Sequence, residues 1–195
     1  MASVCILSAF SEDNVLGQRL LQAYTAGAIA GGHRVQYVNI PRLHFDPFAY
    51  TYAFQNPPAL EEDLRKAVEK MVQSDHLAIF VPIFKSFIPT ITQSFFQLLF
   101  APDNFGKPPA RVWGETPYLQ LKTARIVSTL DADSWAEFQK DRSARFHPVK
   151  KSVLEVLGFR KVRTTTVPPV YDLSAENPFL AKWLGKIEEL GEKNF

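Results

Sequence analysis

Cysteine and histidine are scarce in this sequence, which has one cysteine and four histidines among 195 residues. A single cysteine, Cys5, excludes a disulfide within the chain, and its place in an apolar run favours a buried side chain over a catalytic thiol. No pair of histidines has metal-ligand spacing, so we expect no metal. No Ser-His-Asp arrangement can be assigned either, which argues against a hydrolase.

Strong net charge and long hydrophobic runs are also missing. The formal net charge is +2, which supplies no electrostatic reason to expect a nucleic-acid partner. No apolar run approaches the roughly 20 residues of a membrane-spanning helix, and the N-terminal segment lacks the basic region of a signal peptide. We therefore expect a cytoplasmic protein without an integral membrane segment.

The residues that are abundant indicate a folded domain. Hydrophobic residues make up 46% of the chain, and 16 phenylalanines raise the aromatic content to 13%. This composition can fill a substantial core, and we find no repeat, linker or low-complexity tract. We expect one domain over residues 1–195.

Short apolar runs alternate with segments of helical periodicity. We expect strands over residues 3–10, 33–40, 75–82, 121–131 and 161–170, and helices over residues 15–30, 59–74, 90–100, 147–159 and 177–194. The first, third and fourth strands are almost wholly apolar, as buried parallel strands require. The prediction is an α/β, doubly wound, five-stranded parallel sheet of order 2-1-3-4-5, with helices on both faces.

In such a sheet, ligands bind beyond the carboxyl ends of the strands, at the switch in strand order. Three loops should meet there, with the sequences SEDNVLG (11–17), PIFKSFIP (82–89) and STLDADSW (128–135). The first opens a helix whose N-terminus suits a phosphate, and the second presents aromatic rings. A phosphate at one end and a flat ring at the other would fit a mononucleotide such as a flavin.

Three motifs, in this order, resemble those of the flavodoxin-like, FMN-dependent NAD(P)H:quinone oxidoreductases. LHFDPF (43–48) resembles the family's loop after the second strand. The stretch HLAIFVPIFKSFIPTITQSFFQLLF matches its third strand and aromatic loop at Pro82, Ile83, Phe84 and Pro89. LKTARIVSTLDADSW resembles the next strand and loop, and its matching residues are Thr129, Asp131 and Trp135.

The resemblance extends roughly from residue 4 to residue 170. It implies hydride transfer from NAD(P)H through FMN to a quinone-like acceptor, in a homodimer. It assigns no catalytic side chain, because the cofactor carries the chemistry. From these matches and from the loops that contain them, we expect the cofactor to lie against Ser11, Asn14, Gly17, Pro82, Ile83, Phe84, Lys85, Ser86, Phe87, Ser128, Thr129, Leu130 and Asp131. We expect His44, Tyr50 and Trp135 at the acceptor pocket.

The sequence also departs from this family pattern at the cofactor. The usual histidine of the first loop falls on Ala9 or Phe10, and the usual serine falls on Asn14 or Val15. In the third-strand loop, Lys85 replaces an aromatic residue and Phe87 replaces a glycine. A second hypothesis therefore stays open: a relative with lost or weakened FMN binding that acts as a regulatory or small-ligand-binding protein, for example one ancillary to a transporter.

Overall fold

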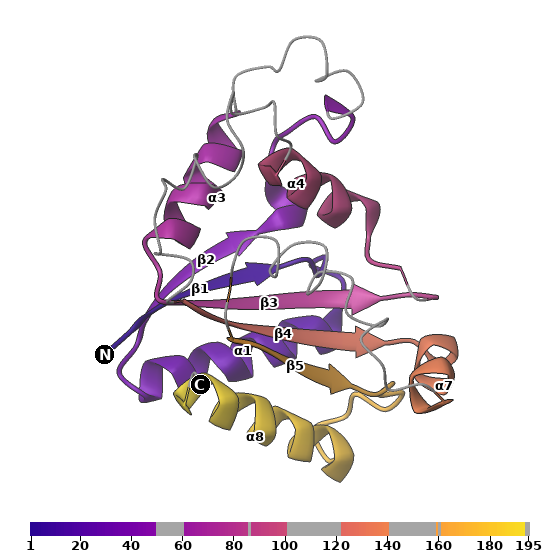
Figure 1. The fold of residues 1–195 in the computed structure, drawn as a ribbon. Helices are drawn as coiled ribbons and strands as arrows, with labels where there is room; N and C mark the ends of the chain where they lie inside the picture. Colours follow the sequence, from indigo (N-terminus) through magenta and orange to yellow (C-terminus); the bar gives the residue numbers. More distant parts are fainter. Residues whose placement is uncertain (50–60, 86, 101–121, 141–158, 160, 194–195) are drawn as a thin grey trace.

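The fold is built on a five-stranded parallel sheet (Figure 1). The computed structural model describes residues 1–49, 61–85, 87–100, 122–140, 159 and 161–193. The strands are β1 (Ser3–Ser8), β2 (Arg34–Asn39), β3 (His76–Ile83), β4 (Thr123–Leu130) and β5 (Lys161–Val167). Their order, β2-β1-β3-β4-β5, confirms the order predicted from the sequence.

Burial of the strands follows their place in the sheet. The central strands β1 and β3 are buried along their whole length, and β4 is buried in all but its first residue. The edge strands β2 and β5 are partly exposed. Near-continuous apolar sequence is what a parallel strand covered on both faces requires, which explains why the three inner strands were the easiest to predict.

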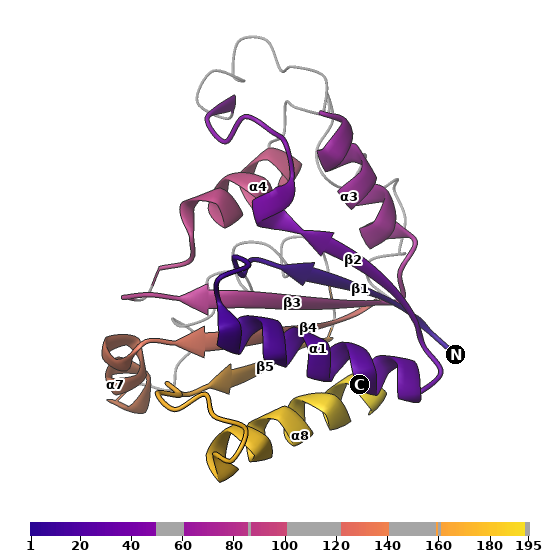
Figure 2. The ribbon, with the colours of Figure 1, turned by 180° about the vertical axis from the view of Figure 1, so that it is seen from behind.

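Helices cover both faces of the sheet. Those described are α1 (Val15–Ala30), the 3-10 helix η1 (Ile40–Arg42), α3 (Glu62–Val72), α4 (Thr90–Phe100), α7 (Ala132–Lys140) and α8 (Pro178–Lys193). Helices α1 and α8 lie side by side over the face nearest the viewer in Figure 2 and share one hydrophobic core with it. Helices α3 and α4 pack against the other face with a second core.

The second core contains Cys5, which lies on β1 and is fully buried. Burial raises the pKa of its thiol to about 12, so it stays protonated at neutral pH. This agrees with the sequence-based expectation of a buried, unreactive cysteine.

Close backbone contact between α1 and α8 depends on two glycines. A Cβ atom at Gly27 would lie 1.9 Å from the carbonyl oxygen of Glu188, and one at Gly191 would lie 2.1 Å from that of Tyr24. Neither contact leaves room for a side chain. The backbones of the two helices are therefore in direct contact at these points, on the face of the sheet that α1 and α8 cover.

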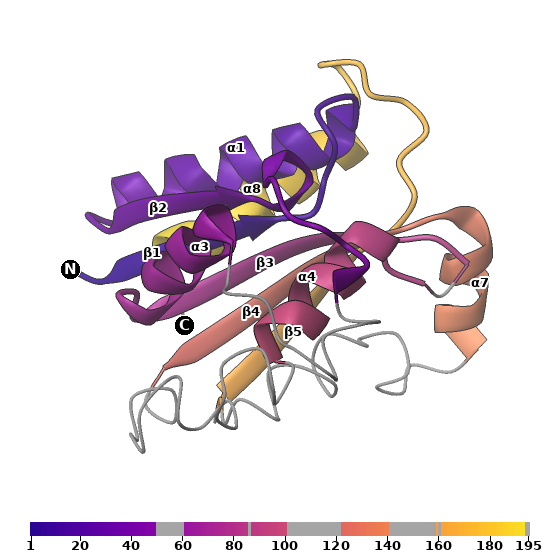
Figure 3. The same cartoon turned by 90° about the horizontal axis from the view of Figure 1, so that it is seen from above.

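One helix was missed by the sequence analysis. Residues 132–135, which we expected in a loop, form the start of α7, which lies beyond the end of β4 in Figure 3. The side chain of Asp131 accepts a hydrogen bond from the backbone N–H of Ser134 at 2.8 Å, as an N-terminal cap does. Trp135 and Phe138 stack on each other and pack on the core, which holds the helix to the sheet.

Other differences are small or lie outside the described residues. The first and fifth strands end at Ser8 and Val167, before the positions expected, and η1 was not expected. The predicted helix over residues 147–159 lies outside the described residues, except for the buried Phe159. In the part of the chain that the structure describes, no helix has both the length and the apolar character that crossing a bilayer demands.

Candidate functional site

The carboxyl ends of β1, β3 and β4 bring three loops together, as the strand order predicts. β3 pairs with β1 on one side and with β4 on the other. The β1–α1 turn, the β3–α4 loop and the β4–α7 junction therefore lie next to one another at one edge of the sheet. The backbone N–H of Ala9 donates to the carbonyl of Phe80 at 2.8 Å, which continues the pairing one residue past the end of β1.

The β3–α4 loop begins with a narrow hairpin. Phe84 and Phe87 exchange two backbone hydrogen bonds of 2.9 Å, so the chain reverses within two residues. Side chains of a directly opposed antiparallel pair lie on the same side of the hairpin. Both rings face solvent, with 54% of Phe84 and 69% of Phe87 exposed. Two exposed phenylalanines at a ligand-binding edge offer a surface on which a flat ring can pack.

The hairpin is tied to the neighbouring strand by Asp131. One carboxylate oxygen of Asp131 accepts from the backbone N–H of Lys85 at 3.1 Å, and the other caps α7 through Ser134. The backbone N–H of Asp131 in turn donates to the carbonyl of Ile83 at 3.3 Å. One residue thus fixes the β3 hairpin relative to the β4–α7 junction.

The ionisation of Asp131 suits this role. Partial burial works to raise its pKa, but the hydrogen bonds from Ser134 and Lys85 together outweigh burial and hold the pKa below its usual value. Asp131 is therefore a carboxylate at neutral pH, and an ionised acceptor makes the stronger hydrogen bonds.

The β1–α1 turn leads into α1 through an asparagine cap. The Asn14 side chain accepts from the backbone N–H of Gly17 at 2.7 Å. No hydrogen bond joins the backbone N–H groups of Glu12, Asp13 and Leu16 to any residue that the structure describes. These N–H groups, at the positive end of α1, are suitable donors to an anion.

Beneath this turn lies Phe10, one of the largest fully buried side chains among the described residues. Its ring packs directly against Gly17, where an added Cβ atom would lie 2.4 Å from the ring. The ring belongs to the core shared with α1 and α8. It therefore packs underneath the turn and does not occupy the space in which a ligand would bind.

The charges at this turn are mixed. Glu12 and Asp13 place two exposed carboxylates beside the free N–H groups. Glu12 forms an ion pair with Arg42, the last residue of η1. The turn therefore offers a phosphate backbone donors and a helix dipole, while the two carboxylates oppose it.

The other predicted site residues differ in where the structure places them. Residues that lie within strands and are buried are Pro82, Ile83, Ser128, Thr129 and Leu130. His44 has an exposed side chain, and its Nδ1 and backbone N–H bind the Asp63 carboxylate of α3 at 3.3 and 2.9 Å. Trp135 is half-buried against Phe138. Tyr50 and Ser86 lie outside the described residues.

The sequence analysis missed the ion pair between Glu12 and Arg42. Arg42 follows the second strand, and that strand neighbours the first in the predicted order, so both residues belong to the same edge of the sheet. The predicted strand order could therefore have indicated that the two residues lie near each other. That the two side chains meet depends on η1, which was not expected.

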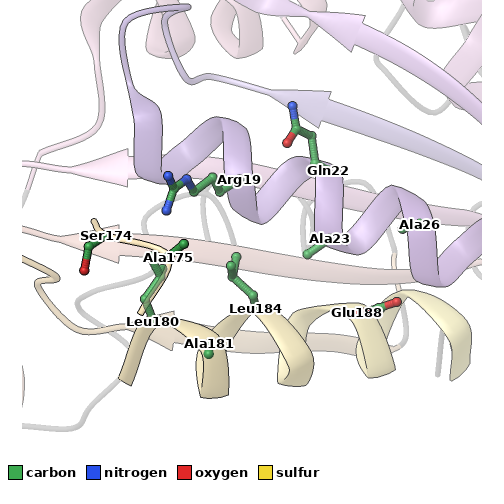
Figure 4. Close-up of a pocket in the computed structure, with 10 residues that line it drawn as sticks. All are labelled: Arg19, Gln22, Ala23, Ala26, Ser174, Ala175, Leu180, Ala181, Leu184 and Glu188. Atoms are coloured by element: carbon green, nitrogen blue, oxygen red, sulfur yellow. The ribbon is translucent and has the colours of Figure 1, made fainter. Parts of the chain in front are cut away.

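A separate hollow of about 500 Å³ lies between α1 and α8 (Figure 4). Its lining residues are Arg19, Gln22, Ala23, Ala26, Ser174, Ala175, Leu180, Ala181, Leu184 and Glu188. None of them is a residue that the sequence predicted at the site. Arg19 donates to the carbonyl of Leu173 at 2.5 Å, which secures the segment after β5.

In the described part of the chain, no three histidine, cysteine, aspartate or glutamate residues cluster closely enough to hold a metal ion.

Comparison with known proteins agrees with this geometry. A family model described as the flavodoxin-like fold matches residues 2–190. Comparison with curated proteins by sequence finds no match. Solved structures with the same fold include an NAD(P)H:quinone oxidoreductase from Methanothermobacter marburgensis, with a TM-score of 0.72 at 17% identity, covering 100% of this chain and 99% of that one.

Two further structures are similar over nearly their full length. Smu.1420 from Streptococcus mutans UA159 has a TM-score of 0.69 at 19% identity and covers 98% of this chain and 99% of its own. An azoreductase from Bacillus anthracis has a TM-score of 0.59 at 13% identity and covers 99% of this chain and 100% of its own. At these identities, the likeness shows a shared fold.

Proposed function

Because the chain belongs to the flavodoxin-like fold family, we propose that it is a flavin-dependent NAD(P)H oxidoreductase with a quinone-like acceptor and FMN as its flavin. The structures of the same fold described above include one named as an NAD(P)H:quinone oxidoreductase and one named as an azoreductase. The chemistry that a flavin supplies when bound is hydride transfer between NAD(P)H and the acceptor.

The observation that carries this proposal is the hairpin at the start of the β3–α4 loop, which has two exposed rings and is hydrogen-bonded to Asp131. Phe84 and Phe87 project at the edge where this fold binds ligands, and Asp131 fixes their position. An aromatic surface held rigid before binding loses little conformational entropy when a flat ring packs on it. The free N–H groups at the start of α1 lie at the same edge and would hold the phosphate.

The chain's own residues would act by position. The hairpin would orient the ring, and the backbone N–H groups of Glu12, Asp13 and Leu16 would face the phosphate. Of the predicted acceptor-pocket residues, Trp135 lies on α7 beside the hairpin's anchor, and His44 lies after η1. A homodimer and a cytoplasmic location complete the proposal and stay predictions, the first measurable by light scattering.

A second candidate function is favoured by the carboxylates of Glu12 and Asp13. Two negative charges beside the phosphate position weaken FMN binding relative to a neutral turn. In this alternative the protein keeps the fold and binds a small ligand or a partner without retaining FMN.

The absorption spectrum of the purified protein separates the two candidates. The spectrum would be recorded as isolated, and again after incubation with FMN and desalting. Under the reductase proposal, flavin bands persist in stoichiometric amount and bleach when NAD(P)H is added without oxygen. Absence of retained flavin in both samples would rule out FMN as a tightly held cofactor and favour the second candidate.

A double variant tests whether the hairpin is the surface that binds the flavin ring. Replacing both Phe84 and Phe87 with alanine removes exposed rings without opening a core cavity, so the fold should persist. We expect this double variant to retain much less flavin than the wild type. Equal retention would show that the hairpin is not the ring-binding surface.

A further inference from the structure

An ion pair joins the β1–α1 turn to the segment after β2. Glu12 lies in the turn, and Arg42 ends η1, next to it at the carboxyl edge. Both side chains are mostly exposed, Arg42 to 69% and Glu12 to 60%. Exposed ion pairs of this kind are weak and open readily in water.

We propose that Glu12 competes with the phosphate of the flavin for Arg42, and that this competition lowers the affinity for FMN relative to a flavin without a phosphate. The inference rests on the proposed function, because it concerns the same flavin site. It makes Arg42 a phosphate-binding residue and Glu12 a determinant of which flavin is held.

The chemistry of the two anions supports this competition. A guanidinium group binds a carboxylate and a phosphate with the same planar donor geometry. In the structure Arg42 pairs with the carboxylate of Glu12, and the backbone N–H of that same residue makes no hydrogen bond to the described residues. An incoming phosphate would replace the Glu12 carboxylate on Arg42 and meet that N–H group at once.

The other charges near the turn leave this role to Arg42. Arg19, in the second turn of α1, has its guanidinium directed to the carbonyl of Leu173. The described residues give Asp13 no ion pair, although it carries the same charge as Glu12 and is its direct neighbour. Asp13 is therefore a matched control: it shares the electrostatic repulsion of Glu12 and lacks the contact with Arg42.

The test measures dissociation constants for FMN and for riboflavin, by quenching of flavin fluorescence, in four forms of the full chain. These are the wild type, E12Q, D13N and R42Q. We expect E12Q to bind FMN about fivefold more tightly, the factor that one surface ion pair represents, with riboflavin unchanged. We expect R42Q to weaken FMN by a similar factor, and D13N to change it by less than about twofold.

Combining the two changes sharpens the test. If Glu12 acts through Arg42, the double variant E12Q/R42Q should bind FMN within about twofold of R42Q alone, the margin also expected for D13N. All substituted side chains are exposed, so thermal unfolding should stay within a few degrees of the wild type, which checks that each variant is folded.

The results that would overturn this inference differ from those that would overturn the proposed function. Equal tightening by E12Q and D13N, or tightening by E12Q that persists in the R42Q background, would overturn the inference and leave the proposed function standing. Identical FMN affinity in all four forms would also overturn the inference and leave the proposed function standing. If no form binds either flavin, the proposed function fails, and the inference fails with it.

Discussion

At the scale of single residues, Lys85 has the most unusual backbone in the described part of the chain. Its φ angle of 48° is in the left-handed region, where it is the one residue other than glycine among those described. This conformation costs a residue with a Cβ atom about 1 kcal/mol. The hydrogen bond to Asp131 and the paired backbones of Phe84 and Phe87 hold it there.

Replacing Lys85 with asparagine should stabilise the protein, because asparagine tolerates the left-handed region better than lysine does. We expect the free energy of unfolding to rise by about 0.5 kcal/mol, as measured by urea denaturation. Lys85→Ala is the matched control, since alanine has the same backbone penalty as lysine. If K85A and K85N raise the free energy of unfolding equally, the increase does not come from the backbone conformation.

The strain at Lys85 also bears on function. Backbone strain of this size persists where the surrounding structure enforces it, and it is concentrated at functional sites. Here the conformation is enforced by the paired backbones of Phe84 and Phe87 and by the Asp131 carboxylate that links the loops. The conformation that costs stability is the one that presents Phe84 and Phe87 to a ligand.

At the scale of secondary-structure elements, the contact between α1 and α8 leads to a paired prediction. A methyl group at Gly191 would lie 2.1 Å from the carbonyl of Tyr24, so Gly191→Ala must push the helices apart. We expect a loss of about 2–3 kcal/mol in unfolding free energy. Gly185 lies in the same helix with no atom within 4 Å of its added methyl, so Gly185→Ala should raise stability by up to about 1 kcal/mol.

Denaturation of the two variants, side by side with the wild type, tests this directly. The two substitutions are chemically identical and lie in one helix, so helix propensity affects them equally. Similar effects in both variants would contradict the close contact between α1 and α8.

Elements were predicted well from the sequence where one pattern determined them. The apolar runs of the inner strands and the periodicity of α1, α3 and α4 located these elements to within a few residues. Helix α7 was missed because its start depends on the Asp131 cap, and the sequence DADSW reads equally well as a polar loop. Propensity alone does not separate these two states in a nine-residue segment.

The site was predictable in outline for a similar reason. Parallel topology determined which loops meet, so 11–17, 82–89 and 128–135 were identified correctly as neighbours at one edge. The contacts between them were not predictable, because they join residues far apart in the sequence. The Lys85–Asp131 hydrogen bond spans 46 residues, and the Glu12–Arg42 pair needs the unexpected η1.

At the scale of the whole molecule, stability should fall in mild acid because of His76. This side chain is buried at the start of β3, and its Nδ1 lies 2.6 Å from the hydroxyl oxygen of Thr123. Burial is the main cause that lowers the pKa of His76, and the positive charges of Arg125, His33 and Arg163 add to it, so that the pKa falls to about 3.

The direction of the pH effect follows from proton binding. The unfolded chain takes up a proton at His76 near pH 6.5, whereas the folded chain does so only near pH 3. Stability is therefore unaffected above pH 6.5 and is lost progressively as the pH falls from 6.5 towards 3. Between pH 6.5 and 4.5 we expect a loss of about 2 kcal/mol from this residue.

Urea denaturation at several pH values, in the wild type and in His76→Asn, measures this contribution. Asparagine keeps a polar group near Thr123 and removes the titration. We expect the wild type to lose more stability than H76N between pH 6.5 and 4.5. Parallel curves for the two proteins would show that His76 does not titrate in the unfolding reaction.

The contact between Phe10 and Gly17 restricts how this protein can change under selection. No larger residue fits at position 17 while the ring of Phe10 is in place, because a Cβ atom there would lie 2.4 Å from the ring. Shrinking Phe10 first would open a cavity in the core and cost about 3–5 kcal/mol. Laboratory evolution towards tighter phosphate binding should therefore leave both positions untouched and accumulate its substitutions at exposed residues of the turn, such as Glu12.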